Sequence, residues 1–353
     1  MTAHPSHKVL YTQIGLPTFQ NRMYSSSAEA SACPRGDMCL VEDLHSGLIY
    51  NAAFRPELMN YDNNYQNEQG LSPLFRSHLD AVANIIARCM GTKSLVEVGC
   101  GKGTFLEILL ARGFDITGFD PAYEGKNPNV VRAPFKAEVD IHAKALVMRH
   151  VLEHVQNPFD FLASLRDANN GGGLIYIEVP CFDWICERRA WFDIFYEHVN
   201  YFRISDFQRM FGKIIETGKL FGDQYLYAVA DLATLQSPRI SPGHRAKFPD
   251  DFTRGLDGPR PAGKSAIWGG ASKGVIFALL KSRLGHLVDA VIDINPAKQG
   301  KYLPATGLLV QSPAQAMQSL PSESNIYVMN SNYLQEIKAM SQGVYNYIAV
   351  DGG

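Results

Sequence analysis

Residues 94–110 read SLVEVGCGKGTFLEILL, and the fold class follows mainly from this stretch. An apolar run of strand length comes first, a turn containing Gly99, Gly101 and Gly103 follows, and a helical pattern begins directly after the turn. Glycines in such a turn let the backbone approach a ligand closely. The amide groups at the start of the helix can bind polar or anionic ligand groups. The stretch therefore predicts the strand, turn and helix that open a nucleotide-type binding domain.

Strands and helices alternate on both sides of this turn. The alternation predicts a parallel sheet with helices on both faces, a doubly wound Rossmann-like fold whose ligand lies beyond the carboxyl ends of the strands. The predicted strands are Ser94–Val98, Asp115–Phe119, Ala145–Met148, Leu174–Val179, Lys213–Lys219 and Gln224–Ala230, and the predicted helices are 72–90, Thr104–Ala111 and Phe159–Asp167.

The chain contains more than this one unit. Residues 236–262 hold five prolines and scattered charge, which is typical of a linker. A second, smaller α/β unit follows, and residues 1–70 predict a small irregular lobe with strand-like pieces at Lys8–Tyr11 and Gly47–Tyr50. We expect an N-terminal lobe at 1–70, a binding domain at 71–235, a linker at 236–262 and a Rossmann-like C-terminal domain at 263–353. The strands of that last domain are predicted at Ser265–Trp268, Ala290–Ile294, Ile326–Met329 and Tyr347–Val350, and its helices at Lys273–Leu280, Pro313–Leu320 and Tyr333–Met340.

Bulk composition excludes several classes of protein. The chain has 353 residues and a formal charge of −2, so no nucleic-acid partner is expected. It has no apolar run long enough to span a membrane, and the first residues lack the apolar core of a signal peptide, so the expected location is the cytoplasm. The six cysteines form no C-x-x-C pair and are expected to be small buried apolar residues.

Two carboxylates narrow the identity of the bound ligand. Glu97 lies at the end of the first strand and Asp120 at the end of the next, where a carboxylate can accept hydrogen bonds from ribose hydroxyls. Together with the glycine turn, they resemble the first motif of class I methyltransferases, although a nicotinamide-binding domain remains an alternative. The resemblance implies S-adenosylmethionine as cofactor, with Glu97 near its methionyl amine. The expected cofactor-binding residues are Glu97, Gly99, Gly101, Gly103, Asp120, Pro121 and His150.

A second segment carries candidate chemistry. Residues 196–202 read YEHVNYF, in which His198 follows Glu197 among aromatic residues. An imidazole that titrates near neutral pH can take up a proton, and a neighbouring carboxylate can hold it in position. A structural histidine–glutamate pair explains the same residues equally well. Upstream, His150, Glu153 and His154 suggest a metal or catalytic cluster, but local packing of His154 is the simpler interpretation.

The order of several motifs resembles that of the sugar C-methyltransferases of deoxysugar biosynthesis. These motifs are E-V-P at 178–180, E-H-V-x-Y-F at 197–202, G-x-x-Y-L at 222–226, GGASKG at 269–274, DINPAKQGKY at 293–302 and, upstream, YDNNY at 61–65. The resemblance implies that a base removes a proton next to the keto group of a nucleotide-linked sugar, and that the enolate attacks the donor methyl group. The resemblance assigns the base to His198, with Glu197 beside it. We also expect catalytic roles for Tyr196 and Tyr65, and substrate binding by Tyr61 and Tyr201. The turn that contains Gly270 and Lys273 precedes a helix and could bind a diphosphate through helix amides and the lysine charge, although a purely structural turn explains it equally well.

One departure from that family concerns metal. Its members commonly begin with a four-cysteine zinc module, whereas this chain has Cys33, Cys39 and His45, with Asp43 and Ser46 where a cysteine pair might stand. Structural zinc favours four Cys or His ligands at tight spacing, so we assign no metal. Packing of the lobe onto the next domain must then replace the zinc. The departure also puts the substrate in doubt, because this lobe helps to wall the acceptor pocket in the family.

The function expected from the sequence is S-adenosylmethionine-dependent C-methylation of a nucleotide-linked keto-sugar or a similar small molecule, by a monomer or homodimer. One alternative is an O- or N-methyltransferase of a natural product on the same scaffold. Another is a nucleotide-sugar binding protein without methyl transfer, or a C-terminal oxidoreductase.

Overall fold

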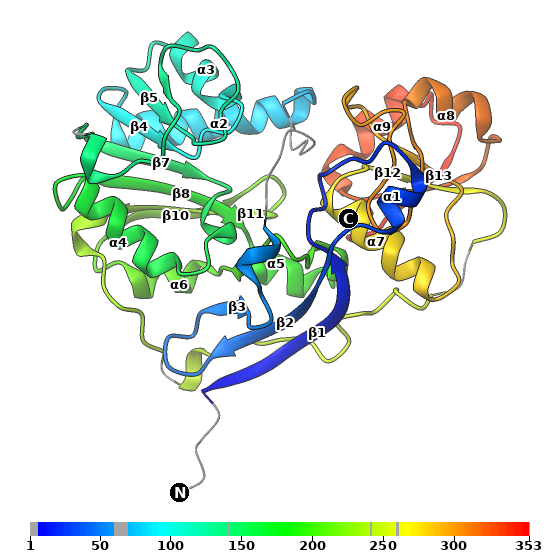
Figure 1. Cartoon of the computed structure of the whole chain (residues 1–353), viewed down its shortest axis with the longest axis horizontal. Helices are drawn as coiled ribbons and strands as arrows, with labels where there is room; N and C mark the ends of the chain where they lie inside the picture. The colour runs from blue at the N-terminus through cyan, green and yellow to red at the C-terminus, as the bar shows by residue number, and fades with distance from the viewer. Residues whose placement is uncertain (1–5, 60–69, 140, 241, 259–260, 353) are drawn as a thin grey trace, which may run out of the picture.

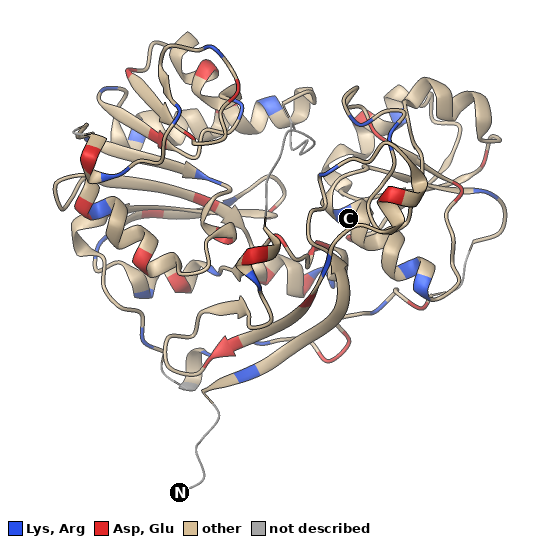
Figure 2. Ribbon diagram, in the orientation of Figure 1, with Lys and Arg blue, Asp and Glu red and all other residues tan. Residues whose placement is uncertain are grey.

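The computed structural model describes the chain except for residues 1–5, 60–69, 140, 241, 259–260 and 353. Three sheets organise the described residues, and Figure 1 shows them as three neighbouring parts. Figure 2 shows that acidic and basic residues are distributed along the chain in all three parts. Every described helix is too short or too polar to cross a bilayer.

The middle sheet has seven strands in the order β10-β11-β8-β7-β4-β5-β6. Strands β4 to β8 run parallel, and β11 pairs with β8 in the antiparallel sense. This confirms the predicted Rossmann-like fold. The elements are α2 (Pro73–Met90), β4 (Leu95–Val98), α3 (Thr104–Ala111), β5 (Ile116–Phe119), β6 (Val130–Val131), β7 (Ala145–Arg149), α4 (Pro158–Ala168), β8 (Leu174–Pro180), α5 (Phe182–Glu187), α6 (Ile204–Met210), β10 (Ile214–Leu220) and β11 (Tyr225–Asp231), with 3-10 turns at Ala137–Val139, Leu152–His154, Trp191–Asp193 and Leu232–Thr234.

The central strands of this sheet could be predicted from the sequence because their residues are buried and therefore apolar. All four residues of β4 are buried, and so are most residues of β7 and β8, because helices cover both faces of a parallel sheet. Helix α2 begins where Ser72 accepts a hydrogen bond from the amide of Phe75 and Pro73 occupies the first turn.

The C-terminal sheet is entirely parallel, in the order β14-β13-β12-β15-β16. It forms the second α/β unit predicted from the sequence, and its cluster of buried apolar residues includes Ala266, Ile292 and Ile326. Its elements are β12 (Ser265–Trp268), α7 (Ser272–Arg283), β13 (Ala290–Ile292), β14 (Val310–Gln311), α8 (Pro313–Ser319), β15 (Asn325–Val328), α9 (Leu334–Met340) and β16 (Asn346–Ala349), with a 3-10 turn at Ser331–Tyr333; another at Pro242–His244 lies in the linker.

The N-terminal lobe contains more strand than the sequence suggested. Its sheet has the order β1-β2-β3-β9, with β1 (His7–Pro17), β2 (Arg35–Asp43), β3 (Ile49–Asn51) and β9 (Asn200–Tyr201). Helix α1 (Ser27–Ser31) and a 3-10 turn at Pro56–Leu58 complete it. The fourth strand, β9, comes from the segment that follows His198, because Tyr201 pairs with Ile49 and Asn200 with Tyr50.

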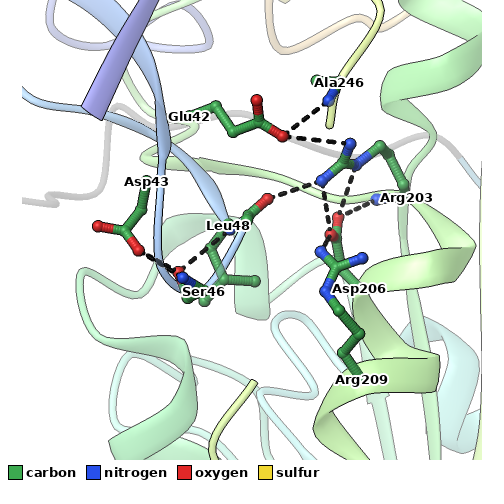
Figure 3. A network of polar contacts seen from close by, with 9 residues as sticks. Glu42, Asp43, Ser46, Leu48, Arg203, Asp206, Arg209 and Ala246 are labelled. Atoms are coloured by element: carbon green, nitrogen blue, oxygen red, sulfur yellow. Dashed lines mark hydrogen bonds and ion pairs between the residues drawn. The ribbon is translucent and has the colours of Figure 1, made fainter. Parts of the chain in front are cut away.

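Ionic contacts join this lobe to the middle domain, as Figure 3 shows. The guanidinium of Arg203 lies 3.0 Å from Asp206 and 3.6 Å from Glu42, and it donates to the carbonyl of Gly47 at 2.7 Å. Glu42 also accepts a hydrogen bond from the amide of Ala246 at 2.7 Å. These contacts connect the lobe, α6 and the linker, and so hold the lobe against the middle domain.

Asp43 and Ser46 occupy the positions where a cysteine pair was considered. Their side chains stabilise a turn through hydrogen bonds. The carboxylate of Asp43 accepts hydrogen bonds from the Ser46 amide at 2.6 Å, the Ser46 hydroxyl at 2.8 Å and the His45 amide at 3.1 Å. Burial raises the pKa of Asp43, but these hydrogen bonds outweigh it and the pKa lies below its ordinary value. A carboxylate-centred turn therefore stands in this place.

Candidate active site

A cavity of about 240 Å³ lies where the carboxyl ends of the two parallel sheets face each other. Residues that follow β7 and β8 line one side of it, and residues that follow β12, β13 and β15 line the other. The lobe contributes Asn21. Carboxyl ends of parallel strands are where such folds bind ligands, so both domains present their ligand-binding edges to one space. The polar and charged lining residues include His150, Glu153, His154, Glu197, His198 and Lys273.

The glycine turn after β4 adjoins this cavity. Gly99 has a φ of 74°, and a Cβ atom at this position would lie 2.4 Å from a side-chain methyl of Val151. Val151 directly follows His150, which lines the cavity. Gly101 has a φ of 56°, and no described atom lies within 4 Å of the place where its Cβ would stand. The turn therefore packs tightly against Val151 at Gly99 and leaves free space beside Gly101, where a ligand can approach the backbone closely.

Glu97 is the main electrostatic feature of the turn. It is buried, and its Oε2 atom has no hydrogen-bond partner among the described residues. Burial raises its pKa to about 7, although the charge of Arg149 lowers it. An unpaired buried carboxylate oxygen is costly unless a positive group meets it. S-adenosylmethionine carries such groups, so the residues present fit the cofactor predicted for them.

Asp120 supports the same turn from the neighbouring strand. Its Oδ2 accepts a hydrogen bond from the amide of Gly101 at 2.8 Å, and its Oδ1 accepts one from Ala122 at 2.8 Å. Each carboxylate oxygen can accept more than one hydrogen bond, so Asp120 can both fix the turn and bind ribose hydroxyls. Pro121, the next residue, is exposed.

Replacing Glu97 by glutamine is expected to weaken binding of S-adenosylmethionine and to stabilise the free protein at alkaline pH. The unfolded carboxyl ionises near pH 4.5 and the folded one near 7, so the folded state holds the extra proton between these values. Stability therefore falls as the pH rises through this window, by up to about 3 kcal/mol. Thermal unfolding at pH 4.5 and pH 8 should show a gain for Glu97→Gln at pH 8 only, and calorimetry should show the loss of affinity. An equal gain at both pH values would contradict this assignment.

His150 belongs to a buried ionic group behind the turn. Its Nδ1 lies 3.3 Å from Glu153, and its Nε2 lies 3.1 Å from Glu178. Glu178 also contacts Arg149 at 2.9 Å and His78 at 3.2 Å. Burial lowers the pKa of His150, but the two carboxylates raise it more, to about 9. His150 is therefore a charged residue on the cavity wall at neutral pH.

His198 reaches the cavity because the lobe holds the chain on both sides of it. Strand β9 follows it, and the preceding residue, Glu197, accepts a hydrogen bond from the amide of Gln20 at 2.6 Å. The His198 ring lies 4.0 Å from the ring of Phe195 and 4.9 Å from that of His154, measured between centroids. Burial is the main reason that its pKa lies well below the ordinary value, and the positive charges of His154, His150 and Lys273 add to this. The imidazole is consequently neutral and has a lone pair available.

The tyrosines to which the sequence analysis gave catalytic or substrate-binding roles do not lie together in the structure. The hydroxyl of Tyr196 accepts a hydrogen bond from the amide of Arg55 at 2.8 Å, so it faces the lobe and does not line the cavity. The hydroxyl of Tyr201 accepts a hydrogen bond from the amide of Phe195 at 3.0 Å, and so fixes the loop that carries His198. Tyr61 and Tyr65 lie outside the described residues.

The C-terminal glycine turn reaches the cavity through Lys273. Its ammonium lies 3.0 Å from Asp193 and 3.1 Å from the side-chain oxygen of Gln224, and it also lies over the ring of Trp184. The amide of Gly270 donates to Asp293 at 2.9 Å. Lys273 therefore links the two domains across the cavity.

Other cavity residues were not assigned from the sequence. Asn21 donates a hydrogen bond to the Ser272 hydroxyl at 3.0 Å, and Lys298 donates one to Asn21 at 3.3 Å. Lys298 lies in the DINPAKQGKY stretch, whose lysine was a usable signal, whereas no pattern around Asn21 marks it.

Comparison with known proteins gives the class of the central domain. Residues 71–214 match the family described as "Methyltransferase domain". The chain is 26% identical over 296 residues to the "C-methyltransferase NovU" of Streptomyces niveus, covering 69% of this chain and 67% of that protein. A SAM-dependent methyltransferase from Archaeoglobus fulgidus matches in structure with 18% identity, covering 43% of this chain and 94% of its own, at a TM-score of 0.33. The plantazolicin methyltransferase BpumL in complex with SAH matches with 14% identity, covering 45% and 84%, at a TM-score of 0.36. The chain is an S-adenosylmethionine-dependent methyltransferase.

Proposed function

We propose that this enzyme methylates carbon, next to the keto group of a nucleotide-linked sugar or a closely similar small molecule. The observation that carries the proposal is the position of His198, a neutral imidazole in the cavity that adjoins the glycine turn. A carbon acid needs a positioned base, since its proton is much less acidic than that of a hydroxyl. The similarity to a C-methyltransferase over two thirds of the chain supports the same choice.

Each expected domain has its own proposed role in ligand binding; the domains are 1–70, 71–235 and 263–353, with a linker at 236–262. The central domain holds the donor, for which Glu97 and the glycine turn are proposed. The C-terminal domain contributes Lys273 and the N-terminal end of the 12-residue helix α7, which together suit a diphosphate. The lobe completes the wall with Asn21.

Residues that line the cavity carry the proton-transfer step of the proposed reaction. Bound S-adenosylmethionine supplies an electrophilic methyl group. His198 takes the proton from the substrate carbon, and Glu197, held by the amide of Gln20, positions the loop that carries the imidazole. Phe195, Tyr225 and Trp268 line the cavity and exclude water from the resulting enolate. Tyr65 is proposed to donate to the enolate oxygen, whereas Tyr196 is proposed to act by fixing the loop against Arg55.

A panel of nucleotide-linked keto-sugars tests the proposal. The full-length chain is incubated with each sugar and S-adenosylmethionine, and products are followed by mass spectrometry and carbon NMR. We expect one sugar to gain the mass of one methylene, with the new methyl group bonded to carbon. Glu97→Gln serves as the control with a weakened donor site. A methyl group on oxygen or nitrogen would replace the proposal by its alternative, and absence of donor binding would refute both.

A further inference from the structure

Glu153, His154 and His198 form a cluster that the proposed reaction uses only in part. Each offers one ligand atom, and these three atoms lie within 4.8 Å of one another. It is the one such group of three or more Asp, Glu, His or Cys side chains found in the described part of the chain. All three residues line the cavity, so a bound ion would keep a side open to solvent or substrate.

Buried unpaired atoms in this cluster point to a ligand. Glu153 is 1% exposed and His198 is 9% exposed. The Oε2 atom of Glu153 and the Nδ1 atom of His198 are buried and have no hydrogen-bond partner among the described residues. Leaving such atoms unpaired costs free energy that a bound ion would recover.

In His154 and Glu153, a second polar atom of the side chain forms a hydrogen bond, as is usual for side chains that bind metal. The Nδ1 atom of His154 lies 2.9 Å from the carbonyl oxygen of Glu197, so Nδ1 carries the proton and the lone pair is on Nε2. The other carboxylate oxygen of Glu153 lies 3.3 Å from His150. Histidine ligands typically donate their second N–H to a carbonyl in this manner, and carboxylate ligands are themselves hydrogen-bonded.

We propose that Glu153, His154 and His198 bind a divalent transition-metal ion of the zinc type, and that this ion inhibits methyl transfer by occupying the imidazole of His198. Two imidazoles and one carboxylate suit Zn²⁺ and Co²⁺ better than Mg²⁺ or Ca²⁺, which prefer oxygen ligands. Three protein ligands leave the fourth position open toward the cavity. The binding site stands on its own geometry, whereas the inhibition rests on the proposed role of His198.

Positive charges near the cluster are largely compensated. Lys273 lies 3.0 Å from Asp193, and His150 contacts Glu178 at 3.1 Å in addition to Glu153. Lys298, on the opposite wall, lies 3.8 Å from Asp293. A divalent ion would therefore meet the carboxylate of Glu153 without facing an uncompensated cation from these elements.

Metal titration of the full-length chain, after treatment with a chelator, tests the site. We expect one Zn²⁺ per chain, and one Co²⁺ whose visible spectrum is typical of nitrogen and oxygen ligands. His154→Ala and Glu153→Gln should each weaken Zn²⁺ binding at least about 10-fold. The exposed His45→Ala should not weaken it, and thermal unfolding verifies that each variant is folded. A thiolate-to-cobalt band, or unchanged affinity in both cluster variants, would overturn the proposal.

The activity measurement is separate from binding. Stoichiometric Zn²⁺ should abolish methyl transfer, and a chelator should restore it. Binding without inhibition would overturn the regulatory part. If no sugar is methylated, the titration still decides whether the metal site exists, so failure of the proposed function remains distinguishable from failure of this inference.

Discussion

Replacing His198 by alanine is expected to lower kcat by about 10²–10⁴-fold, the usual contribution of a positioned general base. The variant removes the neutral imidazole from the cavity but leaves Glu97 and the glycine turn unchanged. Affinity for S-adenosylmethionine should therefore stay close to that of the unmodified protein. The loss should appear in kcat, because the missing interaction acts during proton removal.

Proton exchange isolates this step from methyl transfer. In deuterated water and without donor, the unmodified protein should exchange the proton next to the keto group, and His198→Ala should not. His45→Ala, a change at an exposed histidine of the lobe, is the matched control and should exchange normally. Normal exchange by His198→Ala would show that another group is the base.

Replacing Arg203 by alanine is expected to destabilise the protein by about 3–5 kcal/mol. The change leaves the buried carboxylate of Glu42 without a guanidinium partner among the described residues. It removes one of the two guanidinium partners of the buried Asp206, which keeps its contact with Arg209. It also removes the donor to the carbonyl of Gly47, so the lobe should loosen first.

Denaturant unfolding and limited proteolysis measure this effect. Arg166→Ala is the matched control, because its partner Asp167 is largely exposed and such surface pairs contribute about 1 kcal/mol or less. Arg203→Lys should rescue only part of the loss, since an ammonium cannot reproduce the planar fork. Equal stability of Arg203→Ala and Arg166→Ala would contradict the role given to this network.

The sequence predicted elements best where burial is continuous. Strand β12 and helix α3 have the predicted bounds, and β4, β5, β7 and β8 differ from theirs by one residue at an end. Strand β2 was missed because its residues alternate less clearly and include the cysteines considered for zinc. The two-residue strands β6, β9 and β14 are too short for any periodic signal.

The sequence predicted those residues of the candidate site that lie in a recognisable local motif. Glu97, Asp120 and His198 were assigned from their local sequence, and the structure places them at the turn or in the cavity. Tyr201 was expected to bind substrate, but its hydroxyl accepts a hydrogen bond from the amide of Phe195, a partner that is set by the fold of the loop. Asn21 lies 251 residues from its partner Ser272, and no local pattern encodes such a contact.

Strand β9 has a consequence for how this enzyme can be altered or can diverge. It belongs to the central domain in sequence but to the lobe in hydrogen bonding, through its pairing with β3. A border drawn at residue 70 therefore cuts through one sheet. A graft of the lobe onto another scaffold would have to include the segment from Phe195 to Arg203, which carries β9. The two pieces are distant in the gene, and both lie outside the glycine turn at residues 99–103.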